Sequence, residues 1–129
     1  MPVINRELAE KEVNKWLDAK KVRSTVRREN KLNIEAIIDG FEDGLLILSE
    51  ETNCIKQILI HPTTAIKELI IQPRLKVSER ISKLKGAGDD ADSRVVALLA
   101  ALSGNLTEVL KGLDADDLAV SRNITAFFF

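Results

Sequence analysis

The sequence is poor in the residues on which many extracellular and metal-binding proteins depend. Its 129 residues include a single cysteine and a single histidine, so an internal disulfide and a zinc site built on cysteines are both excluded. No apolar run approaches the roughly 20 residues that a membrane-spanning helix needs. The first dozen residues carry charges where a signal peptide would be apolar. We therefore expect one intracellular domain, residues 1–129, that stays outside the membrane.

Aromatic residues are scarce as well. The chain has no tyrosine, one tryptophan and four phenylalanines, and three of these phenylalanines are the last three residues. The core must therefore be built mainly from Leu, Ile, Val and Ala. The net charge of −1 hides an asymmetry, because residues 1–31 hold nine basic and five acidic side chains whereas residues 32–129 hold ten and fifteen.

Residues that could perform catalysis are almost missing. His61 and Cys54 are seven residues apart, a spacing that places them on opposite faces of one strand. We expect His61 to donate to a backbone carbonyl and Cys54 to pack as a small apolar side chain. The acidic cluster at residues 89–92 lacks the central glycine and distal glutamate of an EF-hand. It is expected to be a solvated loop, and the cluster at residues 114–117 a helix cap. The sequence thus predicts no enzyme, no metal site and no cofactor.

Helical spacing of apolar residues is present toward both ends of the chain. In residues 5–20 the apolar side chains recur at i, i+4, i+7 and i+8, and Asn5 is placed to cap this helix. A second helix is predicted at residues 34–43, ahead of Gly44 as a left-handed stop. Further helices are expected at 77–85, at 93–103 with Ser93 as its cap, at 106–111, and at 114–125 with Asp114 as its cap.

An internal repeat lies in the middle of the chain. Residues 55–62 (IKQILIHP) recur eleven residues later as 66–73 (IKELIIQP). The eleven-residue period has the length of a seven-residue strand plus a four-residue connection, and each copy ends at a proline, which cannot donate to a strand ladder. Both copies also fit a helix face, but their β-branched composition favours strands, and residues 45–48 could add a third.

The predicted fold class is α+β, mainly helical, with a small antiparallel meander of two or three strands near residues 45–73. The domain then consists of a helical segment at 1–44, a strand-rich segment at 45–77 and a helical segment at 78–129.

A basic stretch at residues 20–31 could contact the phosphates of a nucleic acid. It has no interleaved aromatic residue, and the whole-chain pI is about 5.9. We therefore expect a solvated face or an intramolecular match to the acidic half, and keep nucleic-acid binding as a minor alternative. The residues concerned are Lys20, Lys21, Arg23, Arg27, Arg28 and Lys31.

The C-terminal third has an excess of aliphatic side chains. The helix at 93–103 is apolar on nearly every side, so it must either lie at the centre of the core or face a partner. A domain of this size can bury all of these side chains, but an exposed remainder would form a groove for an apolar helix. The three terminal phenylalanines suit the same role, and their removal is expected to leave folding intact. The predicted partner-binding residues are Leu98, Leu102, Leu106, Val109, Leu110, Leu113, Phe127, Phe128 and Phe129.

The order of motifs in the second half resembles that of a known family. IKELIIQP is followed by a helix, an acidic loop, LLAALSG (98–104), a short helix and LDADDLAVSRNITAFF (113–128). This arrangement is similar to the tail assembly chaperones of long-tailed bacteriophages, in particular the small chaperones of contractile-tail phages. The similarity covers about residues 45–128.

The resemblance implies a non-enzymatic role in the host cytoplasm. Such a protein binds the long, helical, apolar tape measure protein, keeps it soluble and helps to recruit tail tube subunits, without remaining in the mature virion. Self-association stays open. Two alternatives also remain: a structural connector or baseplate-type virion protein, which would use the same apolar surface for permanent assembly, and a small nucleic-acid-binding module that uses the basic stretch.

Overall fold

The computed structural model describes residues 3–129 and is 57% helical, with three strands in one antiparallel sheet. The α+β fold class with a small meander is therefore confirmed. The elements follow in the order α1 (Arg6–Lys20), α2 (Ser24–Glu29), α3 (Lys31–Glu42), β1 (Leu46–Leu48), β2 (Ile55–Ile58), β3 (Glu68–Ile71), α4 (Val77–Lys85), α5 (Ala91–Ser103), α6 (Thr107–Leu110) and α7 (Ala115–Thr125), and a 3-10 turn, η1 (Ala126–Phe128), closes the chain.

Side chains cap the N-termini of three helices, α1, α5 and α7. The Asn5 side chain accepts from the backbone N–H of Leu8 at 2.8 Å, which confirms the predicted cap of α1. Beyond α3, Gly44 has a φ of +76°, the left-handed geometry expected of a helix stop. The cap of α5 differs from the prediction, because Asp90 accepts from the backbone N–H of Ser93 and Ser93 itself lies inside the helix.

The repeat forms a strand pair, so the helical alternative is wrong. The sheet order is β1-β2-β3, with Leu46 opposite Gln57 and Ile55 opposite Ile71. The strands are shorter, and the connection longer, than the repeat predicts. The antiparallel register pairs the beginning of the first copy with the end of the second. The connection between the strands contains a turn, in which the Thr63 N–H donates to the Ile66 carbonyl at 2.9 Å.

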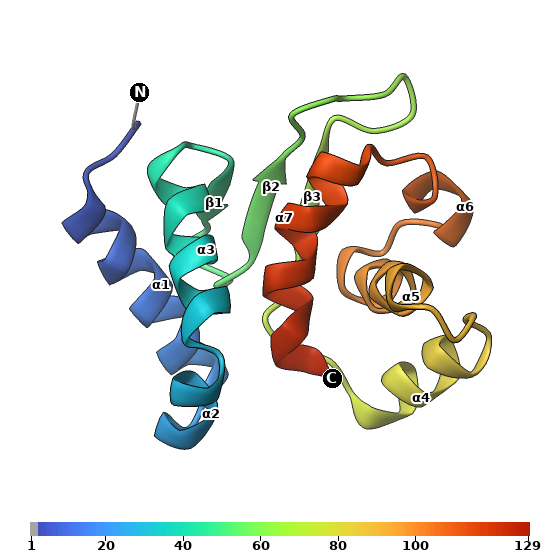
Figure 1. Ribbon diagram of the computed structural model, residues 1–129, viewed down its shortest axis with the longest axis horizontal. Coiled ribbons are helices and arrows are strands. Elements are labelled where there is room, and N and C mark those ends of the chain that lie inside the picture. Colours follow the sequence, from blue (N-terminus) through green and yellow to red (C-terminus); the bar gives the residue numbers. More distant parts are fainter. Residues whose placement is uncertain (1–2) are drawn as a thin grey trace.

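The helices surround the sheet in two groups. Helices α1, α2 and α3 lie at one end of the molecule, α4, α5 and α6 lie at the other, and α7 runs between the groups, where it packs against α3 and α5 (Figure 1). The sheet face toward α7 is buried, whereas Ile47 and Ile70 on the opposite face are almost half exposed, at 48% and 44%. One cluster of mainly aliphatic side chains extends from α1 to the C-terminal turn, as the scarcity of aromatics predicts.

Lys20, the last residue of α1, is turned inward toward the end of the chain. Its ammonium group lies 3.6 Å from the centre of the Phe128 ring and 3.4 Å from the carbonyl oxygen of Pro73. Burial, together with the positive charge of Arg74, lowers the pKa of Lys20 from 10.5 to about 8. The ammonium group of Lys20 therefore loses its proton at a lower pH in the folded chain than in the unfolded chain.

This geometry predicts that the free energy of unfolding rises between about pH 8 and 10.5. In that window the unfolded chain holds the Lys20 proton more tightly than the folded chain does, so stability increases with pH. The expected gain is about 1 kcal/mol, because solvent screens a half-exposed group. Urea denaturation of the wild type and Lys20→Met at pH 7, 8.5 and 10 measures it. The difference between the two proteins should change across the series, and a constant difference would refute the assignment.

Candidate functional site

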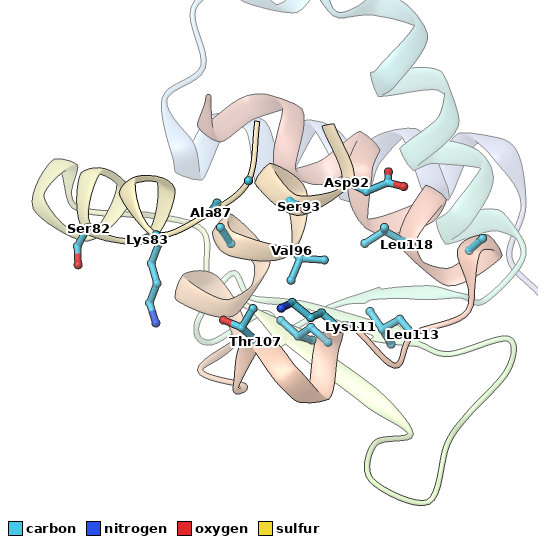
Figure 2. Close-up of a pocket in the computed structure, with 15 residues that line it drawn as sticks. Ser82, Lys83, Ala87, Asp92, Ser93, Val96, Thr107, Lys111, Leu113 and Leu118 are labelled. Atoms are coloured by element: carbon cyan, nitrogen blue, oxygen red, sulfur yellow. The ribbon is translucent and has the colours of Figure 1, made fainter. Parts of the chain in front are cut away.

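A cavity of about 650 Å³ opens between α4, α5 and α6 (Figure 2). Its floor is apolar and comes from buried or half-buried side chains: Val96 and Ala97 on α5, Leu110 on α6, Leu113 in the following turn, and Leu118 on α7. Exposed charged side chains, which include Lys83, Lys111 and Asp92, stand at its rim. An apolar floor with a charged rim is the arrangement that receives one face of an amphipathic helix.

We call this cavity the groove. Small residues form one of its walls and leave it open. Gly86, Ala87 and Gly88 connect α4 to α5 and all three line the cavity. A side-chain carbon built on Gly86 would meet no atom within 4 Å. Helix α4 has no fully buried residue, and Val77 and Ile81, one turn apart, are 61% and 59% exposed. A second apolar strip therefore lies on the same helix that forms a wall of the groove.

The predicted partner-binding residues differ widely in how far they are exposed. Leu98, Leu102, Leu110 and Phe128 are at most 5% exposed, so the expectation that they form an exposed surface is wrong. Helix α5 packs against β3, α4, α6 and α7, so its leucines are buried inside the domain. Leu110 and Leu113 line the groove. Val109 and Phe127 are half-buried, and only Leu106 and Phe129 of the set are exposed, at 74% and 50%.

The terminal phenylalanines are part of the packing rather than a free tail. Phe127 meets Trp16 edge-on, with 5.7 Å between the ring centres. Phe128 is buried beneath the ammonium group of Lys20. Phe129 borders a second cavity of about 400 Å³, where the guanidinium of Arg94 lies 5.5 Å from the centre of its ring.

The basic stretch is only partly available to a ligand. Lys20 is turned toward Phe128, and Arg27 pairs with Asp18 at 2.8 Å and donates to the Val22 carbonyl. Asp18 itself belongs to residues 1–31, so this ion pair is not the expected match to the acidic half of the chain. The other four cations, on and around the short helix α2, are exposed: Lys21, Arg23, Arg28 and Lys31.

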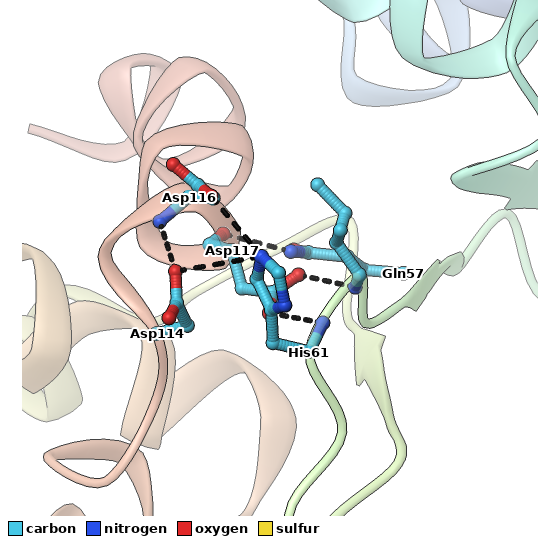
Figure 3. A network of polar contacts seen from close by, with 6 residues as sticks. Gln57, His61, Asp114, Asp116 and Asp117 are labelled. Carbon is cyan, nitrogen blue, oxygen red and sulfur yellow. Dashed lines mark hydrogen bonds and ion pairs between the residues drawn. The ribbon is translucent and has the colours of Figure 1, made fainter.

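A buried polar network joins the sheet to α7 (Figure 3). Asp117 is fully buried, and its carboxylate accepts the backbone N–H groups of Ile60 at 2.6 Å and His61 at 3.0 Å. The amide of Gln57 donates to the Asp117 carbonyl oxygen at 2.9 Å, and the Ser121 hydroxyl donates to the Gln57 side-chain oxygen at 2.6 Å. The expected helix cap at residues 114–117 does not include this network, because its members are about 60 residues apart in the chain.

The side chain of His61 meets carboxylates, not the backbone carbonyl that the sequence suggested. Its Nε2 atom lies 3.1 Å from Asp116 and 3.9 Å from Asp114, at the beginning of α7 (Figure 3). Asp114 caps this helix, as predicted, by accepting from the backbone N–H of Asp116 at 2.9 Å. One potential metal-ligand atom from each residue lies within 4.8 Å of the others. The cluster joins two segments that sequence reasoning treated separately.

Comparisons with protein-family models, with curated proteins and with solved structures found no match to this chain. Among residues 3–129, no helix has the length and apolar character needed to cross a membrane.

Proposed function

We propose that the protein is a non-enzymatic tail assembly chaperone of a bacteriophage. It binds an apolar helical segment of the tape measure protein in the host cytoplasm and helps tail tube subunits to assemble around it, and it is absent from the mature virion. The observation that carries the proposal is the groove between α4, α5 and α6, with its apolar floor and charged rim. The order of motifs in residues 66–128, which resembles that of the tail assembly chaperones, is the reason for proposing this family.

The groove suits transient binding of a helix rather than chemistry. Apolar side chains at i, i+3 or i+4, and i+7 of the tape measure segment would lie over the groove, where the half-buried Leu113 and Leu118 offer more apolar surface than the buried Val96 and Leu110. Acidic flanks of the same segment would meet Lys83 and Lys111. Val77 and Ile81 extend the apolar contact along α4 and become covered when the complex forms.

The test is to fill the groove without disturbing the core. Ala87→Trp places a large ring at the mouth of the groove, whereas Leu32→Trp places the same ring on α3, where Leu32 is 82% exposed. Fluorescence anisotropy with overlapping helical segments of the tape measure protein from the same phage then measures affinity. We expect Ala87→Trp to weaken binding about tenfold or more, a change of about 1.4 kcal/mol, while Leu32→Trp binds like the wild type. Equal binding by both variants would refute the groove as the site.

Analysis of purified phage particles separates the chaperone from a structural connector. A chaperone is found in the infected-cell lysate together with the tape measure protein and is missing from mature particles. A connector or baseplate-type protein remains in them at a fixed copy number. Binding to duplex DNA that falls steeply with salt would instead favour the four exposed cations around α2 as the functional surface.

A further inference from the structure

We propose that His61, Asp114 and Asp116 form a binding site for a divalent transition-metal ion, with Zn²⁺ as the reference ion. The ion would link the connection between β2 and β3 to the beginning of α7. This site is separate from the groove and does not depend on the proposed chaperone function.

The distances between the ligand atoms fit one shared ion. Two ligands that each lie about 2.1 Å from a zinc ion are about 3.4 Å apart at a tetrahedral angle. The Nε2 atom of His61 is 3.1 Å from the Asp116 carboxylate and 3.9 Å from the Asp114 carboxylate. These two values lie on either side of the ideal separation, and all three ligand atoms lie within 4.8 Å of one another. Rotation of the exposed side chains would then bring the three ligands onto one ion.

The chemistry of the three ligands selects the type of ion. Two carboxylates balance the charge of a divalent cation, and an imidazole nitrogen favours zinc, nickel or copper over magnesium and calcium, which prefer oxygen ligands alone. All three side chains are about half exposed or more. Water can therefore complete the coordination, as it does at zinc sites with three protein ligands.

The buried network holds the ligands in place before an ion arrives. Asp117 fixes the backbone of His61 by accepting its N–H at 3.0 Å. Asp114 is fixed as the cap of α7 through the N–H of Asp116, and its carboxylate retains lone pairs for an ion. The positive end of α7 opposes a cation weakly, and the two carboxylates outweigh it because each carries a full negative charge. Hydrogen bonds therefore hold the backbone of both segments that supply ligands, the connection after β2 and the beginning of α7.

The only histidine of the sequence makes the test direct. In the full chain without a histidine tag, one set of imidazole NMR signals reports on His61 alone. Titration with ZnCl₂ at pH 7 should shift these signals saturably at one ion per chain and raise the Tm, because an ion that binds only the folded state stabilises it. MgCl₂ and CaCl₂ at the same concentrations should leave the signals unchanged.

Variants assign the ligands. His61→Ala and Asp116→Asn should each weaken zinc binding, measured by calorimetry, by about tenfold or more. Asp89→Asn, which changes an exposed carboxylate in another loop, and Cys54→Ala, which removes the single thiol, should bind like the wild type. The proposal is overturned if the imidazole signals do not saturate, if either ligand variant binds zinc normally, or if magnesium and calcium shift the signals equally. The contacts of His61 would then be only a surface hydrogen bond and a neighbouring charge.

Discussion

Deleting residues 127–129 is expected to lower the free energy of unfolding by about 4–6 kcal/mol. Removing a buried phenylalanine side chain costs about 3–5 kcal/mol, and Phe128 is 5% exposed. Phe127 adds its edge-on contact with Trp16, which contributes about 1 kcal/mol. The Phe128 carbonyl, which accepts from Arg80 of α4 at 3.3 Å, is lost as well. This result is the reverse of the sequence-based expectation that the terminal phenylalanines are dispensable for folding.

Urea denaturation followed by circular dichroism measures the loss, and Phe129→Ala is its matched control. Phe129 is 50% exposed, so the single substitution should change stability by less than about 1 kcal/mol. Typical domains are stable by about 5–15 kcal/mol, so the deletion product should be partly unfolded near physiological temperature. A deletion product with the midpoint of the wild type would show that Phe128 contributes little to the core.

Asp117→Ala is expected to destabilise the fold by about 3 kcal/mol. The carboxylate accepts two backbone N–H groups at the end of β2, and hydrogen bonds to charged acceptors contribute about 1.5–3 kcal/mol each. Ile60 and His61 are exposed, so water can accept hydrogen bonds from their N–H groups in place of the lost carboxylate. This exchange reduces the expected loss of stability. Without the Asp117 carboxylate, the connection between β2 and β3 keeps only the exposed contacts of the His61 side chain with the beginning of α7.

The neighbouring carboxylate supplies the control for this prediction. Asp116→Ala changes an exposed side chain on the same helical turn and should cost less than about 1 kcal/mol. Asp117→Asn should fall between the two, because an amide keeps one acceptor oxygen but turns a donor toward the other N–H group. Thermal unfolding of the three variants ranks them, and equal midpoints for Asp116→Ala and Asp117→Ala would contradict the role assigned to Asp117.

Prediction from sequence succeeded where a local pattern specifies the outcome. The apolar spacing in residues 5–20 and the capping group of Asn5 define α1, because helix periodicity and end capping depend on residues within one or two turns. The repeat at 55–73 yielded strands for a similar reason, since short β-branched runs ending at proline do not continue as helices. Its register was not predictable, because register depends on which residues meet across the pair.

The candidate sites were the part that local patterns could not supply. An all-apolar helix such as α5 indicates either a core position or a binding surface, and only the packing of four elements around it distinguishes the two. The groove lies where α4 packs against α5, beside the small residues at 86–88. His61 and Asp116 are 55 residues apart in the chain and 3.1 Å apart in space, and no spacing rule connects them.

The sequence alone determined the fold class, the positions of most elements and the aliphatic nature of the core. These features follow from short-range periodicity, capping chemistry and composition. Only the tertiary structure decided which leucines are exposed, that the C-terminal phenylalanines belong to the core, and that Asp117 fastens the sheet to α7. The reason is physical: burial and polar pairing depend on contacts between segments brought together by folding, and those contacts leave no fixed spacing in the chain.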